Sequence, residues 1–464
     1  MDFSAANHDL WGPIIQIGII AALVLLANIM RRKLKFIQKS MIPTAVLAGF
    51  ILLLLKYFNL VPVIDNVFLE TITYHTIALG FIAMSLRVPE KTIETEKMIG
   101  SRTGALIVST YLVQAIVGLA VSLFFAYTFM PDLFKSSGIL LAMAYGQGPG
   151  QANNVGTSYE NLGFAGGQSF GLSLAAAGYI CACVVGVVFL NIFNKKGKLT
   201  KSGQKNFVSG SVTVDTFEDK NEVPISESVD RLSIQIALIC IVYLVTYLIT
   251  WGLTELLAVI SAGLAATISP MLWGFNFIIG SMVAAGCRTL FTGLRKVKLM
   301  NRQYQNNYLL SRISGFLFDV MIICGIASIN IDDLKGYWVP FIIMAAAGGI
   351  VTFIFLMWLS KKLYKGYFYE GFFSMYGMLT GTISSGVLLL REIDPQMKTP
   401  ASNNLISGSS FAIAFGAPLL VLISMAPKSE MMTWIVFGLA IIYLAALLTF
   451  IFLAGRKGKK KDNK

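Results

Sequence analysis

Long apolar stretches separated by short polar segments recur along almost the whole chain. A helix of about 18–25 residues crosses the hydrocarbon core of a bilayer, and these stretches have that length. They are continuously apolar rather than alternating in polarity, which argues against a transmembrane β-barrel. We therefore predict an all-α polytopic membrane protein with spans near residues 13–30, 41–56, 71–86, 103–127, 166–190, 232–252, 270–290, 307–329, 337–360, 403–425 and 431–454.

Two apolar segments, at about 138–165 and 371–400, are interrupted by glycines and polar residues. Each follows four spans and precedes one more, so the order of elements in residues 1–190 is repeated in residues 232–425. Each half then has an odd number of complete crossings, and the second half is inverted relative to the first. Inverted repeats with interrupted helices at matching positions are typical of secondary transporters.

The remaining parts of the chain fit around these two halves. Residues 191–231 are polar and lack apolar periodicity, so we expect a cytoplasmic linker. Residues 426–464 add one extra transmembrane helix and a basic cytoplasmic tail.

Composition agrees with the membrane class, because 56% of residues are hydrophobic, only 13% are charged and the mean hydropathy is +0.71. The net charge of +13 comes from basic segments between the apolar runs, so it indicates membrane orientation and not nucleic-acid binding. Basic loops alternate with neutral or acidic ones. We expect the N-terminus outside, the C-terminus in the cytoplasm, a bacterial inner membrane and lipid as a partner.

The first interrupted segment carries the sequence Tyr145-Gly-Gln-Gly-Pro-Gly-Gln-Ala-Asn-Asn-Val-Gly156. So many glycines disfavour a continuous spanning helix, at about 1 kcal/mol each relative to alanine. Non-helical backbone at membrane depth survives only inside protein or facing a water-filled cavity. We therefore predict a re-entrant hairpin whose tip binds a small polar solute through Gln147, Gly148, Gly150, Gln151, Asn153 and Asn154.

The second interrupted segment, Tyr376–Gly386, has a tip rich in hydroxyl groups. By symmetry it is a hairpin that enters from the opposite face, and we expect the two tips to meet near the midplane. Its candidate substrate-binding residues are Thr380, Gly381, Thr382, Ser384, Ser385 and Arg391. The alternative is that these glycines and serines serve only close helix packing.

Helix ends and side-chain oxygens at such tips suit two kinds of ligand. Backbone N–H groups at a helix N-terminus attract an anion, whereas carbonyl, amide and hydroxyl oxygens suit Na⁺. The candidate sodium ligands are Asn153, Thr382, Ser385 and Asp319.

Two charged residues allow more than one interpretation. Asp319 lies in the middle of a span, where a lone carboxylate is costly and often functional. It could bind Na⁺, carry a proton or contact a substrate amine, or it could form an ion pair with Arg312 or Arg288. Arg391 could bind a substrate carboxylate or anchor the segment at the cytoplasmic face.

The chain resembles the bacterial glutamate:sodium symporter family over roughly residues 13–425. The similar stretches are Ile42-Pro43 with Ala48-Gly49, the segment around Gln114, Tyr145–Gln151 and Gly377–Ser385. The resemblance implies a homodimer with a scaffold and a moving transport domain, an elevator-type mechanism, Na⁺ as the coupling ion and no other cofactor.

Several positions depart from the family pattern. Gln147 and Pro149 stand where the family tends to have His and Thr, Ile383 stands in place of a Pro, and Leu388 in place of an Asn. Glutamate is therefore the first candidate substrate, and another amino acid or small carboxylate, coupled to Na⁺ or H⁺, is the alternative.

Other classes of function are less consistent with the pattern. The chain has no His-Glu-x-x-His motif and no phosphate-binding Gly-x-x-x-x-Gly-Lys-Ser/Thr loop, so we do not expect an enzyme. An ion channel or a membrane scaffold protein is the alternative from another class. We predict a sodium-coupled symporter of a small anionic or zwitterionic solute.

Overall fold

The computed structural model describes residues 2–4, 7–35, 37, 42–88, 98–195, 225–260, 265, 269, 272–274, 276–300, 304–394 and 399–461. These residues form helices joined by short connections and include no strand. Among them, ten helices are long and apolar enough to cross a membrane. The prediction of an all-α, multi-pass membrane protein is therefore confirmed.

The helices group into two compact units, and each unit takes segments from both halves of the sequence. Unit 1 comprises residues 1–66, 92–207 and 325–464, and unit 2 comprises residues 67–91 and 208–324. Unit 2 contains α4 (Asn66–Leu86, with only Asn66 in unit 1), α9 (Ile225–Ile260), α11 (Asn276–Lys296) and α12 (Asn307–Ala327).

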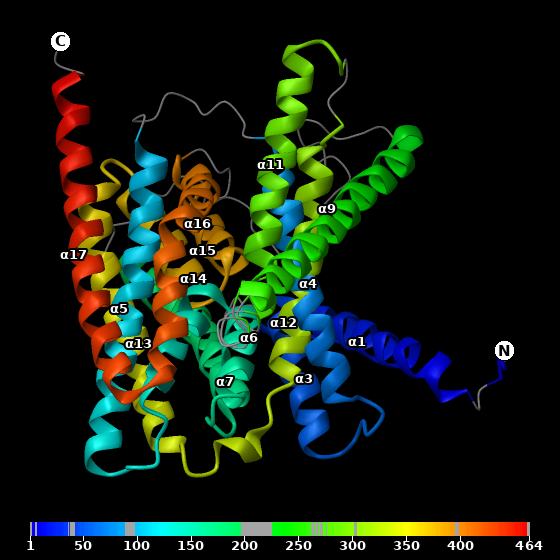
Figure 1. Ribbon diagram of the computed structural model, residues 1–464, viewed down its shortest axis with the longest axis horizontal. Coiled ribbons are helices and arrows are strands. Elements are labelled where there is room, and N and C mark those ends of the chain that lie inside the picture. The colour runs from blue at the N-terminus through cyan, green and yellow to red at the C-terminus, as the bar shows by residue number, and fades with distance from the viewer. Residues whose placement is uncertain are drawn as a thin grey trace. The chain divides into compact units, whose positions relative to one another are not determined.

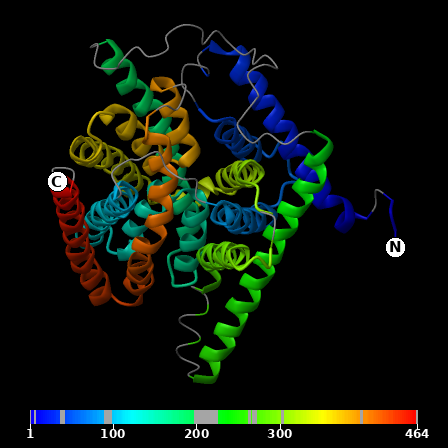
Figure 2. The same ribbon diagram turned by 90° about the horizontal axis from the view of Figure 1, so that it is seen from above.

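The first part of unit 1 contains α1 (His8–Lys33), α3 (Thr44–Tyr57), α5 (Ile99–Thr128), η1 (Lys135–Ile139), η2 (Ala142–Gly146), α6 (Pro149–Glu160), α7 (Gly167–Ile180), η3 (Cys181–Val185) and α8 (Gly186–Lys195). Its second part contains η5 (Ile331–Leu334), α13 (Trp338–Leu363), α14 (Phe368–Thr380), α15 (Ile383–Ile393), α16 (Ala401–Met425), η6 (Ala426–Lys428) and α17 (Glu430–Lys461). Figure 1 labels most of the α-helices, and in Figures 1 and 2 the colour follows the chain from its N-terminus to its C-terminus.

Several predicted boundaries shift, and two of these changes alter the predicted elements. The span predicted at 41–56 is described as α3, which has 14 residues and begins directly after Pro43. At 1.5 Å per residue this helix is about 21 Å long, shorter than a bilayer core. The predicted linker 191–231 is helical at both ends, because α8 continues to Lys195 and α9 begins at Ile225, and its middle lies outside the described residues.

Helix α5 is the centre of unit 1, with α13, α16 and α17 packed along it (Figures 1 and 2). Most of its 30 residues are buried, including polar ones such as Thr103, Ser109 and Gln114. A helix that is apolar on every side is expected to be surrounded by other helices. Small residues allow the closest approach: a β-carbon on Gly118 would lie 1.9 Å from the carbonyl oxygen of Gly138 in η1.

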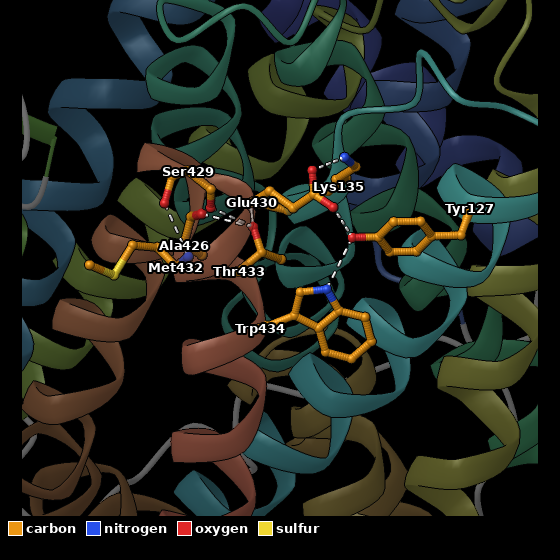
Figure 3. Close-up of polar contacts among 9 residues, drawn as sticks. Tyr127, Lys135, Ala426, Ser429, Glu430, Met432, Thr433 and Trp434 are labelled. Carbon is orange, nitrogen blue, oxygen red and sulfur yellow. Dashed lines mark hydrogen bonds and ion pairs between the residues drawn. The ribbon is translucent and has the colours of Figure 1, made fainter.

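The additional helix α17 is fixed to unit 1 near its first turn (Figure 3). Glu430 forms an ion pair with Lys135 and accepts a hydrogen bond from the Tyr127 hydroxyl. Trp434 Nε1 donates to the same hydroxyl at 3.0 Å. The Thr433 hydroxyl donates to the Ala426 carbonyl at 3.0 Å.

A second group of contacts fixes α17 near the other end of its apolar part. The Arg102 guanidinium, which is buried, donates from Nε to the Ile451 carbonyl oxygen at 3.2 Å. One residue on, the Phe452 ring packs edge-to-face against Trp358 of α13. The extra helix is thus an integral part of unit 1.

Unit 2 is held together by aromatic and small residues of its four helices. Phe81 of α4 contacts the rings of Phe277 in α11 and Phe318 in α12. A β-carbon on Gly80 would lie 2.7 Å from the Phe318 ring, so this glycine permits the close packing of α4 on α12. Hydrogen bonds also join these helices: the Tyr243 hydroxyl of α9 bonds to His75 Nδ1 of α4 at 2.7 Å.

The contact between Gly118 and Gly138 gives a first prediction. A methyl group on Gly118 would overlap backbone atoms of Gly138, which cannot rotate away. We therefore expect Gly118→Ala to lower the free energy of unfolding by about 1–3 kcal/mol. Thermal unfolding of the purified protein in detergent measures this. Gly416→Ala in α16 is the matched control, because nothing lies within 4 Å of a β-carbon there. Equal melting temperatures for the two variants would contradict the packing described.

Candidate functional site

The first interruption of the helices lies between η2 and α6, at Gln147 and Gly148. Gly148 has φ +88°, a left-handed conformation that side chains with a β-carbon rarely adopt. Pro149 follows at the first position of α6, where its missing N–H costs no helical hydrogen bond. This Gly-Pro pair explains why one helix ends and the next begins here. We call the interruption at Gln147–Gly148 the first break.

A second interruption lies between α14 and α15, at Gly381–Thr382, and we call it the second break. Helix α14 ends at Thr380, Thr382 is fully extended, and α15 begins at Ile383. The two helices pack tightly through glycines, since a β-carbon on Gly377 would lie 2.7 Å from the Ser385 carbonyl oxygen.

The two breaks lie next to each other within unit 1. A β-carbon on Gly148 would lie 3.3 Å from Thr382 Cγ2 and 3.6 Å from the Gly381 carbonyl oxygen. Helix α7 closes one side, because a β-carbon on Gly178 would lie only 2.3 Å from the Thr380 carbonyl oxygen. Segments more than 200 residues apart in the sequence therefore meet at one place.

Both breaks present a helix N-terminus without a side-chain cap. Neither Gly148 before α6 nor Thr382 before α15 caps its helix through a side chain. The first N–H groups of a helix have no acceptor within that helix. In α6 these belong to Gly150 and Gln151, and in α15 to residues 383–385. They give each break a partial positive charge that suits an anion.

Buried oxygen atoms without a partner gather beside these N-termini. Gln151 Oε1, Thr382 Oγ1 and Ser385 Oγ are each inaccessible to solvent and make no hydrogen bond among the described residues. A buried polar atom left unpaired costs about 1–3 kcal/mol, so such atoms are uncommon in folded proteins. Oxygens of this kind at the breaks could accept hydrogen bonds from a small solute or coordinate a cation.

Other predicted site residues are used within the protein. Asn153 Oδ1 accepts a hydrogen bond from Gln168 Nε2 at 2.8 Å, and the Thr380 hydroxyl donates to the Tyr376 carbonyl at 2.7 Å. Gln147 Nε2 donates weakly to Met143 Sδ at 3.7 Å. Asn154 is buried within α6, and its carbonyl accepts from Ser158. These groups therefore help to fix the shape of the site, and they have few hydrogen-bonding positions left for a ligand.

Two predicted residues are described only in their backbone. Ser384 and Arg391 both lie in α15, and their side chains are outside the described part of the structure. Ser384 falls in the first turn, beside the break, whereas Arg391 is near the end of the helix.

Gln114 of α5 belongs to the site, although sequence reasoning included it only through the family resemblance. Its Nε2 donates to the Leu379 carbonyl oxygen at 2.8 Å and to Thr352 Oγ1 at 3.0 Å. Its Oε1 is buried without a partner, and a β-carbon on Gly146 would lie 2.9 Å from it. Gln114 therefore ties α13 and the end of α14 to α5 and presents an oxygen beside the first break. An amide within a long apolar run is the sequence signal for such a residue.

The glycines near the breaks have different roles. Gly156 lies against Gln168 and Gly167, and Gly386 lies against the Ser374 carbonyl, so both serve close helix packing. Packing thus accounts for part of the glycine content. Gly148 is the position in the breaks where a positive φ requires glycine.

Asp319 lies in α12 of unit 2, whereas the two breaks lie in unit 1. Its side chain is exposed, and no ion pair joins it to either arginine considered as a partner within the described residues. Arg288 donates instead to the carbonyl oxygens of Ser85 and Arg87, and Arg312 stacks over the Tyr308 ring. Asp319 and the other candidate sodium ligands therefore belong to different units.

One pattern in unit 1 is similar to a hydrolase motif. Gly167–Gly171 reads Gly-x-Ser-x-Gly, which in hydrolases places a nucleophilic serine on a strand-to-helix turn beside a histidine. Here the Ser169 hydroxyl donates to Asp333 Oδ2 at 2.8 Å and accepts from the Asn330 N–H at 3.2 Å. These contacts fasten the start of α7 to the loop before α13, and Ser169 has a structural role.

The contrast between Gln114, which donates two buried hydrogen bonds, and Ser385, whose hydroxyl makes none among the described residues, gives a second prediction. Gln114→Leu removes two buried hydrogen bonds and leaves the Leu379 carbonyl unpaired, so we expect a loss of about 1–3 kcal/mol in stability without ligand. Ser385→Ala removes an oxygen that has no partner, and we expect little change.

Thermal or denaturant unfolding of both variants in the same detergent checks this contrast. A loss of stability in Ser385→Ala as large as that in Gln114→Leu would mean that the Ser385 hydroxyl has a structural role.

No protein-family model matches the chain, and no curated protein matches its sequence. What the site can do is therefore inferred from its own groups. Residues 145–154 and 376–386 contain no charged side chain. Two uncapped helix N-termini and several free oxygens can hold a small anion or zwitterion together with a monovalent cation.

Proposed function

We propose that this protein is a secondary transporter of a small anionic or zwitterionic solute, coupled to Na⁺. The observation that carries the proposal is the meeting of two breaks, Gln147–Gly148 and Gly381–Thr382, with uncapped helix N-termini and unpartnered buried oxygens. A site of this kind between discontinuous helices is typical of secondary transporters.

The order of elements supports an inverted-repeat interpretation. A long helix, α5 or α13, precedes each broken segment, and another helix, α7 or α16, follows it. In the proposal the segments containing η2–α6 and α14–α15 are re-entrant hairpins that enter from opposite faces. Their tips then form one site that can be reached from either side of the membrane.

The substrate's negative group would lie against the free N–H groups of Gly150, Gln151 and residues 383–385. Neutral surroundings suit a carboxylate of an amino acid or a small carboxylic acid, because a helix N-terminus stabilises an anion without a fixed counter-charge. Glutamate is the first candidate, on the resemblance to the glutamate:sodium symporter family, and the departures at Gln147, Pro149, Ile383 and Leu388 leave other amino acids and carboxylates open.

The cation would bind to oxygens that the protein leaves free. Thr382 Oγ1, Ser385 Oγ, Gln151 Oε1 and Gln114 Oε1 are hydroxyl and amide oxygens, the ligand type that Na⁺ prefers over nitrogen or sulfur. A cation among these oxygens offsets the charge of the anion beside it, so each ligand strengthens the binding of the other. Such mutual stabilisation is the basis of coupled transport.

The two units suggest how the site moves. Unit 1 contains both breaks, and unit 2 contains α4, α9, α11 and α12. In an elevator mechanism unit 1 would carry the site while unit 2 acts as the scaffold, within a homodimer in a bacterial inner membrane. Helices α1 and α3 group with unit 1, so in this mechanism they would move with the site.

Ligand binding can be tested by thermal stability, giving a third prediction. In NaCl, but not in KCl, the correct amino acid or carboxylate should raise the melting temperature, because a ligand of the native state stabilises it by mass action. At 100 times Kd the gain is about 2.7 kcal/mol.

Thr382→Val and Ser385→Ala should abolish this stabilisation and leave the ligand-free melting temperature unchanged. Ser424→Ala is the matched control, because the Ser424 hydroxyl donates to the Leu420 carbonyl of its own helix. A screen in which no amino acid or carboxylate stabilises the protein in Na⁺ would overturn the proposal.

Transport itself gives a fourth prediction. In proteoliposomes an inward Na⁺ gradient should accumulate the substrate above its external concentration, whereas a channel would only allow equilibration. Asp319→Asn tests whether this carboxylate, which lies outside the breaks, takes part in cation or proton coupling. We expect the variant to accumulate less substrate and its uptake to depend differently on Na⁺. Unchanged uptake and unchanged ion dependence would remove Asp319 from the mechanism.

A further inference from the structure

The lysines at the two ends of α13 have different partners. Lys335, just before α13, forms an ion pair with Asp332 at 2.9 Å. Lys361 and Lys362, in the last turn of α13, are exposed and have no carboxylate partner among the described residues.

These two lysines lie over aromatic rings. Lys362 Nζ is 5.0 Å from the centre of the Trp358 ring and 5.2 Å from that of Phe452 in α17. Lys361 Nζ is 5.8 Å from the centre of the Phe368 ring. Trp358 is 41% exposed. Amphipathic aromatic rings of this kind favour the interface between hydrocarbon and headgroups, so the adjacent ammonium groups are at the level of lipid headgroups.

Helix α17 ends on the same side and adds further positive charge. Its apolar part closes at Ala454, two residues after Phe452, and its backbone remains helical to Lys461. Five of the six residues 456–461 are lysine or arginine. The contact between Lys362 and Phe452 places the start of this basic extension beside the end of α13.

The opposite ends of these two helices have a different charge balance. Glu430, at the start of α17, is paired with Lys135, and the hydrogen bond that Lys135 donates to this carboxylate raises the pKa of Lys135. At that end Lys135 and Lys335 are thus paired with carboxylates of the protein. At 1.5 Å per residue, the 26 residues of α13 separate the two ends by about 39 Å, the thickness of a bilayer with its headgroups.

We propose that Lys361, Lys362 and the basic extension 456–461 form a binding surface for anionic phospholipid headgroups. Clusters of four to eight basic residues directly after a membrane helix have this affinity, because each cation near the surface is attracted to the negative lipids. The surface is built on α17, which is fastened to α5 by Arg102 and the Glu430 contacts. The lipid would therefore stabilise unit 1, whatever solute the breaks bind.

The test uses the full-length protein in detergent, titrated with short-chain phosphatidylglycerol or phosphatidylcholine while thermal stability is recorded. We expect phosphatidylglycerol to stabilise the protein and phosphatidylcholine not to. The effect should weaken in 0.5 M salt, since salt at that order of concentration screens exposed charges within about 5 Å. Lys361→Gln with Lys362→Gln should weaken phosphatidylglycerol binding by about fivefold per charge.

Matched variants separate this site from a general charge effect. Lys335→Gln with Lys428→Gln removes two lysines at the opposite ends of α13 and α17 and should leave lipid binding unchanged. Lys361→Arg with Lys362→Arg keeps the charge and should also bind normally. If the glutamine pair does not fold, neutralising the basic residues of 456–461 serves as the second variant, with the same expected loss.

Three results would overturn the proposal. Equal stabilisation by phosphatidylcholine would show that the headgroup charge is irrelevant. Equal stabilisation by glycerol phosphate would show that the surface binds free phosphate and not lipid. An equal loss of affinity in the Lys335/Lys428 control would show that the effect is not located at this end of the molecule.

Discussion

The need to satisfy backbone hydrogen bonds in apolar surroundings constrains this protein more than any other interaction. In a membrane-spanning helix each N–H and C=O group is satisfied within the helix, and only an interruption leaves such groups free. Gln147–Gly148 and Gly381–Thr382 are two interruptions of this kind, and unit 1 is organised around them. Gly178 and Gly377 let neighbouring backbones approach them, and Gln114 bonds to the Leu379 carbonyl next to the second.

The same constraint separates structural polar groups from those available to a ligand. Ser169, Thr380 and Asn153 have partners within the protein, so they define the shape of unit 1. Thr382 Oγ1 and Ser385 Oγ are buried without partners. Leaving such atoms unpaired destabilises the fold. On the proposed function, a ligand that bonds to them would stabilise the protein and favour the conformation in which the breaks meet.

Charge is distributed away from the site and toward the membrane surfaces. The segments at the breaks carry no charged side chain, and helix ends there provide only partial charges. Full charges occur at the ends of α13 and α17, where Lys135 pairs with Glu430 on one side and Lys361 and Lys362 remain without carboxylates on the other. This arrangement leaves the segments at the breaks without charged side chains and places the lysines of α13 and the glutamate of α17 at the helix ends.

The class of the protein, the approximate positions of most spans and the locations of both breaks could be predicted from the amino-acid sequence alone. Hydropathy and the Gly-Pro sequence at 148–149 act locally, so they can be read without knowledge of the fold. Only the tertiary structure decided that Gly148 lies against Thr382, that Gln114 faces Gly146, and that Asn153 is already bonded to Gln168. It also divided the chain into units that cut across the two sequence halves, with Asp319 in one unit and both breaks in the other. These features depend on which distant segments pack together, and the complementary shapes of glycines and side chains on different helices determine that packing.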